Sequence, residues 1–277
     1  MKRECLVMLR AALLVFMLAG ALPAQNAHAL DMSVSQDDVG QLWLQMTGRV
    51  EYGDEVRFKA LLIDALGRGQ HIENVATYSS GGQVSPALKI GSYIRTLHMT
   101  TVAPDLVPVL GRHLCRMHDE AGRGIATYDP RTRQGDARCT CSGECLLIWV
   151  AGLVRVGNAG QIRRLVVPKG DDVTARDVSA AEMQADSRHA VEAYLRAAGA
   201  SETTISRMFE LSPDKLEYLS KEERAALDVS SLQRLHEAIG ARCRDHAPTS
   251  PAALGCEKGI VRELYWRGAE QLLSEAE

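Results

Sequence analysis

The chain has 277 residues, of which 46% are hydrophobic and 24% charged. This composition is typical of a globular protein and excludes a disordered or fibrous one. The formal net charge of −3 at pH 7 gives no indication of a nucleic-acid or membrane-surface partner.

The first 29 residues have the pattern of a secretory signal peptide. A basic start is followed by an apolar run over 11–22, and Ala27-His28-Ala29 supplies the small residues of a cleavage site, so we expect cleavage before Leu30. This segment carries three basic residues and one acidic residue, so the mature chain has a net charge of −3 − 2 = −5. The apolar run is too short for a convincing membrane span, and no later segment predicts one. We therefore expect a periplasmic protein without a membrane span after cleavage.

Six of the seven cysteines follow the expected cleavage site. An even number of cysteines in an exported chain predicts disulfide bonds, because no glutathione pool keeps the thiols reduced. The candidates are Cys115, Cys139, Cys141, Cys145, Cys243 and Cys256. The sequence favours a Cys243–Cys256 bond across a proline-rich loop, and a bond from Cys115 to one of the three cysteines over 139–145. It does not choose among the 15 possible connectivities.

The first half of the mature chain predicts alternating strands and helices. The predicted elements are a strand over 42–50, a helix capped by Asp54, a strand over 72–78, a helix capped by Ser85 with Pro86 in its first turn, and a strand over 99–103. This order is typical of an α/β protein with parallel strand pairing.

Residues 105–138 contain many arginines and turn formers without a clean period, which predicts a long loop. Short strands are predicted over 154–156 and 164–167, and helices from Thr174 onward. The predicted helix starts are Ser201, Ser212-Pro213 and the capping box from Ser220 to Glu223. The predicted domains are a core over 30–173, with an inserted loop at 105–138, and a helical region over 174–277 packed on it.

Two segments carry residue types that suit catalysis. Gly81 and Gly82 follow a strand and precede a helix, so their backbone N–H groups are candidates for stabilising an oxyanion. The alternative for them is a simple strand-to-helix turn. In the second segment, Cys139-Thr-Cys-Ser-Gly-Glu-Cys-Leu-Leu-Ile-Trp-Val-Ala-Gly152, the continuous apolar run predicts a buried helix that begins near Ser142. Ser142 is then either a nucleophile at the positive helix end or an ordinary N-cap.

In order and spacing, these segments resemble the periplasmic proteins that are similar to the proteolytic subunit of Clp protease, within the Clp/crotonase superfamily. The resemblance covers about residues 40–230. It includes the helix with Ile-Gly-Ser-Tyr-Ile-Arg95 and the apolar helix ending Ala-Gly-x-x-Arg155. It implies a crotonase/Clp-like superhelix of β-β-α units, here with a helical C-terminal extension, as well as homo-oligomers and a serine–histidine peptidase site.

The residues that match the family's site do so unevenly. The glycine pair matches the oxyanion-hole glycines, and Cys141 and Cys145 match the cysteines that bracket the nucleophile. The nucleophile position midway between them is Gly143, and Ser142 stands one residue early. The general-base position is Pro168, which cannot accept a proton. The resemblance therefore implies a peptidase site that has lost both catalytic groups.

These observations predict a catalytically degenerate periplasmic protein that binds a peptide or protein and needs no cofactor. A second hypothesis is an active serine hydrolase in which Ser142 recruits His98, His113 or His118 as its base. A third is a cysteine-based redox or metal-binding module, in which His113, Cys115 and His118 would join the later cysteines around zinc.

Overall fold

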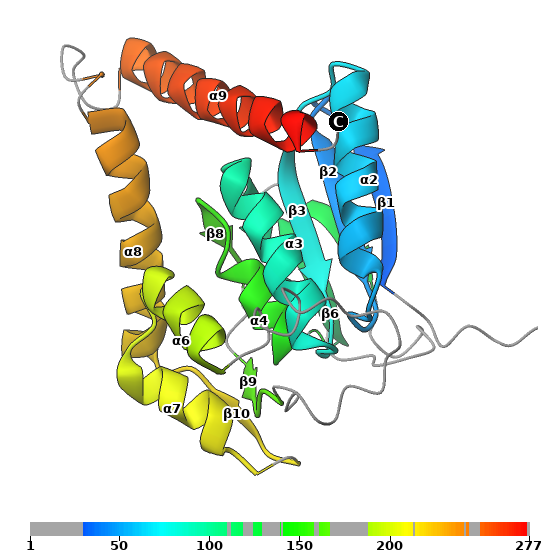
Figure 1. Ribbon diagram of the computed structural model, residues 1–277, viewed down its shortest axis with the longest axis vertical. Helices are drawn as coiled ribbons and strands as arrows, with labels where there is room; N and C mark the ends of the chain where they lie inside the picture. The colour runs from blue at the N-terminus through cyan, green and yellow to red at the C-terminus, as the bar shows by residue number, and fades with distance from the viewer. Residues whose placement is uncertain are drawn as a thin grey trace, which may run out of the picture.

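The computed structural model describes residues 30–109, 112–118, 124–128, 139, 141–157, 161–166, 188–212, 214–240, 242–243 and 250–275. It is a mixed α/β protein with a central sheet, helices that pack against it and two smaller sheets (Figure 1). The expected signal peptide, the general-base position Pro168 and the predicted domain boundary at 173 lie outside the described residues, so the signal peptide and the domain division remain predictions.

The central sheet has five strands in the order β1-β2-β3-β4-β8. The strands are β1 (Asp31–Gln36), β2 (Leu42–Thr47), β3 (Ile72–Tyr78), β4 (Thr100–Val102) and β8 (Arg155–Val156). The parallel pairing expected from the sequence is confirmed from β2 through β8, whereas β1 adds an antiparallel edge. The predicted strand over 42–50 ends at Thr47, and Val50 instead forms an isolated bridge with Gly82.

Helices α2 (Asp54–Gly67), α3 (Val84–Thr96) and α4 (Glu144–Trp149) enclose the main core against the sheet. Residues such as Phe58, Ile90 and Trp149 are fully buried there. The predicted α4 helix is confirmed, and every one of its residues is buried.

Two predicted helix caps are wrong by one or two residues. Gly53 is the N-cap of α2, and Asp54 is the first helical residue. The Asp54 carboxylate instead accepts the backbone N–H groups of Leu30 and Glu51, at 3.1 and 2.7 Å. Helix α3 begins at Val84 after Gln83, so Ser85 lies inside its first turn.

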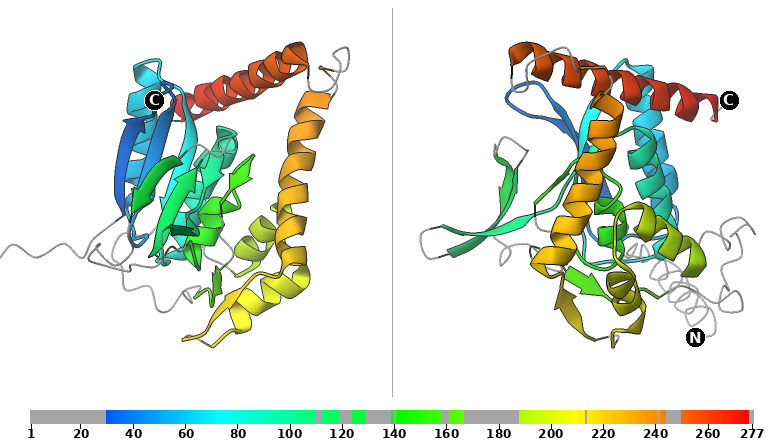
Figure 2. Two further views of the ribbon diagram at one scale, coloured as in Figure 1. Left: turned by 180° about the vertical axis from the view of Figure 1, so that it is seen from behind. Right: turned by 90° about the vertical axis from the view of Figure 1, so that its left-hand side faces the viewer.

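The prediction of a loop over 105–138 is also wrong for the part of this segment that the structure describes. That part forms a three-stranded antiparallel sheet from β5 (Asp105–Val109), β6 (Arg112–His118) and β7 (Gly124–Tyr128). In the side view it projects away from the central sheet (Figure 2). Met117 of β6 packs against Trp43, Ala76 and Val102, one from each of three central strands. The small sheet is thus attached through a separate apolar cluster.

The C-terminal part contains α6 (Arg188–Ala197), α7 (Glu202–Glu210), α8 (Lys221–Gly240) and α9 (Pro251–Ser274). The helix starts at Ser201 and at the Ser220 capping box are confirmed. Ser212 starts no helix, because the chain enters strand β10 (Leu216–Tyr218), which pairs with β9 (Gln161–Arg163). Strand β9 lies before the predicted strand over 164–167, and the chain is not helical throughout from Thr174.

Several contacts join the C-terminal helices to the body. The guanidinium of Arg155, which is 9% exposed, donates to the carbonyls of Val150, Ala198 and Leu227 at 2.6 to 3.1 Å. The Cys243–Cys256 disulfide links the ends of α8 and α9, as the sequence favours. Within the described ranges, no helix has the length and apolar character needed to cross a membrane.

Candidate functional site

The strand-to-helix turn after β3 brings Gly81 and Gly82 against the loop at Val50. The φ angles of the two glycines are 122° and 150°. A Cβ on Gly82 would lie 2.0 Å from the Val50 carbonyl oxygen, so only glycine fits there. Val50 N–H donates to Gly81 O at 3.0 Å, and Gln83 N–H donates to Val50 O at 2.8 Å. These bonds hold the Gly82 N–H in a fixed position.

The second segment of interest lies directly beside this turn. Cys141 forms a parallel bridge with Ser79, and the Ser142 N–H donates to the Ser79 carbonyl at 3.2 Å. Gly143 then turns the chain into α4, with φ 59° and ψ −122°. A Cβ there would lie 3.8 Å from Gly81 Cα. The structure therefore brings together the two segments that the sequence singles out, although Gly82 and Glu144 are 62 positions apart in the sequence.

Ser142 is not the N-cap of α4. The N-cap is Gly143, without a side-chain cap bond. Ser142 is only 2% exposed, and its hydroxyl donates to the Ser80 carbonyl at 3.4 Å. Its backbone lies between two segments, because its N–H donates to the Ser79 carbonyl and it forms a bridge with Gln161. The hydroxyl is thus neither a helix cap nor exposed to a substrate.

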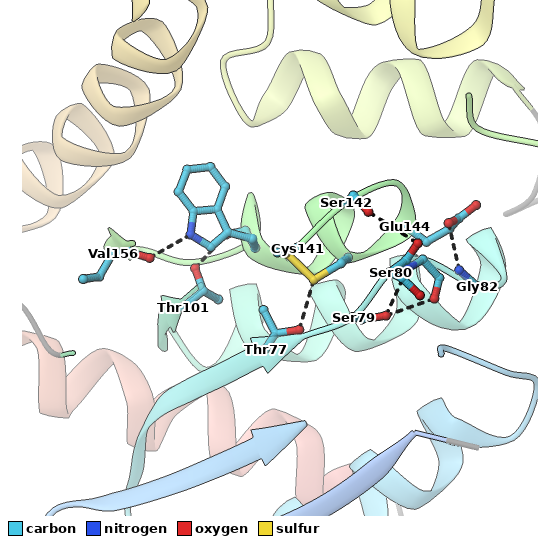
Figure 3. The surroundings of a disulfide bond; sticks show 12 residues. Thr77, Ser79, Ser80, Gly82, Thr101, Cys141, Ser142, Glu144 and Val156 are labelled. Atoms are coloured by element: carbon cyan, nitrogen blue, oxygen red, sulfur yellow. Dashed lines mark hydrogen bonds between the residues drawn. A yellow bond between two sulfur atoms is a disulfide. The ribbon is translucent and has the colours of Figure 1, made fainter. Parts of the chain in front are cut away.

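Glu144 is the site residue that sequence reasoning missed. Its side chain turns back over the glycine turn (Figure 3), and Oε2 accepts the Gly82 N–H at 2.8 Å. Glu144 is 8% exposed. Burial raises the pKa of Glu144, while hydrogen bonds from its own backbone and from Gly82, and the charges of Arg49 and Arg163, lower that pKa in part. The one signal in the sequence is a single acidic residue at the start of an otherwise apolar run.

No histidine shares a hydrogen bond with Ser142 in the part of the chain that the structure describes. His98 follows α3 at the end opposite Gly82, about 20 Å away for a 13-residue helix, and its Nδ1 lies 3.1 Å from the Thr96 carbonyl oxygen. His118 Nε2 lies 2.7 Å from Asp105 Oδ2. The side chain of His113 lies outside the described residues.

Disulfide bonds hold both sides of the turn at Gly143. Cys141 and Cys145, both fully buried, form a bond across a Cα–Cα distance of 5.0 Å. Cys115 of β6 bonds Cys139, as one of the expected pairings has it, and this ties the small sheet to the segment before the turn. All six sulfurs are therefore engaged and none is a thiolate that could bind zinc. Over the described ranges, no group of three potential ligands is placed to hold a metal ion.

No protein-family model matches this chain, and no curated protein matches it. Among solved structures it is similar to two mutant forms of a membrane-bound stomatin-specific protease, one of them in complex with a substrate peptide. For both, the sequence identity is 10% and the TM-score 0.36, over 71% of this chain and 83% or 78% of the other. The mixed α/β fold described above does not depend on this similarity.

Proposed function

We propose that this protein is a periplasmic, catalytically inactive relative of Clp-type peptidases with a crotonase/Clp-like core, and that it binds a peptide or protein. The observation that carries the proposal is the Glu144 carboxylate on the Gly82 N–H, at 2.8 Å. In a serine peptidase such an N–H stabilises the oxyanion that forms on the substrate. Here a carboxylate from the chain itself holds that donor, and a second negative charge beside it would be repelled.

Among the residues that the structure describes, the groups that would perform hydrolysis are missing from this place. Gly143, at the turn into α4, has no side chain, and its Cβ direction passes Gly81 at 3.8 Å. Ser142 is buried and donates to a carbonyl oxygen instead of to a base. A serine without a positioned base loses roughly 10²–10⁴-fold in rate. The site therefore supports binding better than turnover.

The surroundings of the turn suit a peptide. Tyr52 and Val166 are exposed by 42% and 65%, and they lie on the two segments that flank the glycine turn, the loop after Val50 and the chain after β9. Exposed apolar side chains can serve as contact points for a peptide that binds in extended form. Self-association, which the family resemblance implies, belongs to the same proposal, and sedimentation of the mature protein tests it.

A fluorophosphonate probe tests the loss of catalysis directly, because it labels only a serine activated by a base. We expect no labelling of the mature protein, and no difference between the wild type and Ser142→Ala. Labelling at Ser142 that disappears in Ser142→Ala would contradict the proposal and restore the hydrolase hypothesis.

Binding without turnover is tested with a library of unmodified pentapeptides. We expect equilibrium dialysis against the mature protein to retain a subset of the library, and mass spectrometry to recover those peptides intact. Retention of none, or recovery of cleavage products, would overturn the proposal. For the location, the intact mass of the exported protein should correspond to a chain that begins at Leu30.

A further inference from the structure

Two arginines lie on segments that approach the glycine turn, and their charges act on Glu144. We call the Gly82 N–H, Arg49 and Arg163 the carboxylate seat. Arg49 directly precedes Val50, which forms a bridge with Gly82. Arg163 lies on β9, and its Cβ is 3.6 Å from where a Cβ on Gly143 would stand. Both arginines act electrostatically on Glu144, so their charges reach the carboxylate that sits on Gly82.

The two arginines are not neutralised to the same degree. Arg49 Nε lies 3.6 Å from Glu51 Oε1 in a half-exposed pair. Arg163 has no ion pair within the part of the chain that the structure describes, and it belongs to the half-buried residues around the site. The Glu144 carboxylate thus accepts one backbone N–H and is acted on by the charges of two arginines. This surplus of positive charge and donors is typical of a site that receives an anion.

The Glu144 carboxylate shows which chemical group fits beside the Gly82 N–H. Its burial gives a reason why the Glu144 side chain can be displaced from that position. Glu144 accepts a 2.8 Å hydrogen bond from Gly82 N–H, so a planar carboxylate has room at this donor. The same carboxylate is 8% exposed, and burial opposes its charge. A swing of the side chain into water would recover hydration while a ligand group takes over the hydrogen bond.

We infer that the carboxylate seat receives the terminal carboxylate of a peptide in place of the Glu144 side chain. This inference rests on the peptide binding proposed above and adds the ligand class, peptides with a free C-terminus.

The first experiment removes the Glu144 carboxylate by substitution and tests whether a small carboxylate in solution binds in its place. In Glu144→Ala, propionate should raise the melting temperature in a saturable manner, while propionamide of the same shape and sodium chloride of the same ionic strength should not. In the double variant Glu144→Ala/Arg163→Gln, the apparent affinity for propionate should fall about tenfold. Wild-type protein, whose seat is filled, should not respond. Equal stabilisation of Glu144→Ala by propionate and propionamide would overturn the inference.

The second experiment uses the wild-type protein and does not depend on a variant that folds. Two pentapeptide libraries of the same composition, one with free C-terminal carboxylates and one amidated, are compared by equilibrium dialysis. We expect retention of the free acids to be about tenfold stronger. Equal retention would overturn the carboxylate inference and leave peptide binding intact. Retention of neither library, with propionate still binding Glu144→Ala, would support the seat and contradict the proposed function.

Discussion

Glu144 determines the chemistry of the site because its carboxyl group is buried and hydrogen-bonded at once. Transfer from water into the protein disfavours the charged form, whereas the Gly82 N–H and the two nearby arginines favour it. Burial is the larger influence, so the pKa of Glu144 is raised above its ordinary value of 4.5. A raised pKa means that the folded protein binds a proton at Glu144 more readily than the unfolded chain does.

The pH dependence of stability follows from this shift. Between pH 4.5 and the raised pKa of Glu144, the folded state binds more protons at this residue than the unfolded state, so its contribution to stability falls as pH rises. Glu144→Gln can still accept the Gly82 N–H but does not ionise. We therefore expect the free energy of unfolding of the wild type, relative to Glu144→Gln, to decrease as pH rises from 4 to 8. Urea denaturation of both proteins across this range measures the difference. A difference that stays constant or increases with pH would contradict the assignment.

At the scale of elements, the sequence predicts those helices and strands that are determined by local apolar periodicity. The helices α2, α3 and α4 and the strands β2, β3 and β4 follow from apolar periodicity, and the parallel order follows from their alternation. The sheet β5–β7 does not follow, because its strands are defined by pairing with one another outside the central sheet and only Cys115 and Met117 of β6 are seen to be buried. Strand β10 is likewise defined by its partner β9.

The candidate site is likewise predictable from sequence in one part and not in another. The proximity of Gly81 and Gly143 is implied by the family resemblance and present in the structure. The position of Glu144 is not predictable from sequence, because an acidic residue in the first turn of a helix is ordinarily explained by the helix dipole. Only the three-dimensional path of the glycine turn reveals that the carboxylate accepts the Gly82 N–H.

The Cys115–Cys139 disulfide is the covalent part of the attachment of the small sheet β5–β7, in addition to the apolar cluster around Met117. That bond joins residues 24 apart, and its entropic contribution to stability is about 3.5 kcal/mol. We expect Cys115→Ala/Cys139→Ala to destabilise the protein by about that amount and to accelerate backbone hydrogen exchange in β5–β7 more than in β2–β4. Cys243→Ala/Cys256→Ala is the matched control, since it removes a bond of separation 13 between α8 and α9. If exchange in β5–β7 rises equally in both variants, the disulfide does not anchor that sheet.

At the scale of the whole molecule, the last helix connects the end of the chain to elements from its first half. Helix α8 leads away from β9 and β10, and α9 returns across the ends of α2 and α3, so that the end of α9 lies beside α2 (Figure 1). The Tyr265 hydroxyl accepts the buried N–H of Ile72 at 3.2 Å, and its ring makes an edge contact with His71 at a centroid distance of 3.9 Å. The start of β3 is therefore held by a residue from the far end of the chain.

Helix α9 approaches the backbone at the end of α3 closely at Gly268. A Cβ there would lie 2.0 Å from the Thr96 carbonyl oxygen and 3.3 Å from Leu97 Cα, both backbone atoms that cannot rotate away. Gly268→Ala should therefore push α9 from α3 and destabilise the protein by about 1–3 kcal/mol.

Gly259 lies in the same helix with nothing within 4 Å of its Cβ position. Gly259→Ala should stabilise the protein by about 1 kcal/mol through helix propensity alone. Chemical denaturation of the two variants measures both effects. Opposite signs would show that α9 docks through Gly268, whereas stabilisation by both substitutions would mean that α9 does not pack on α3 in solution.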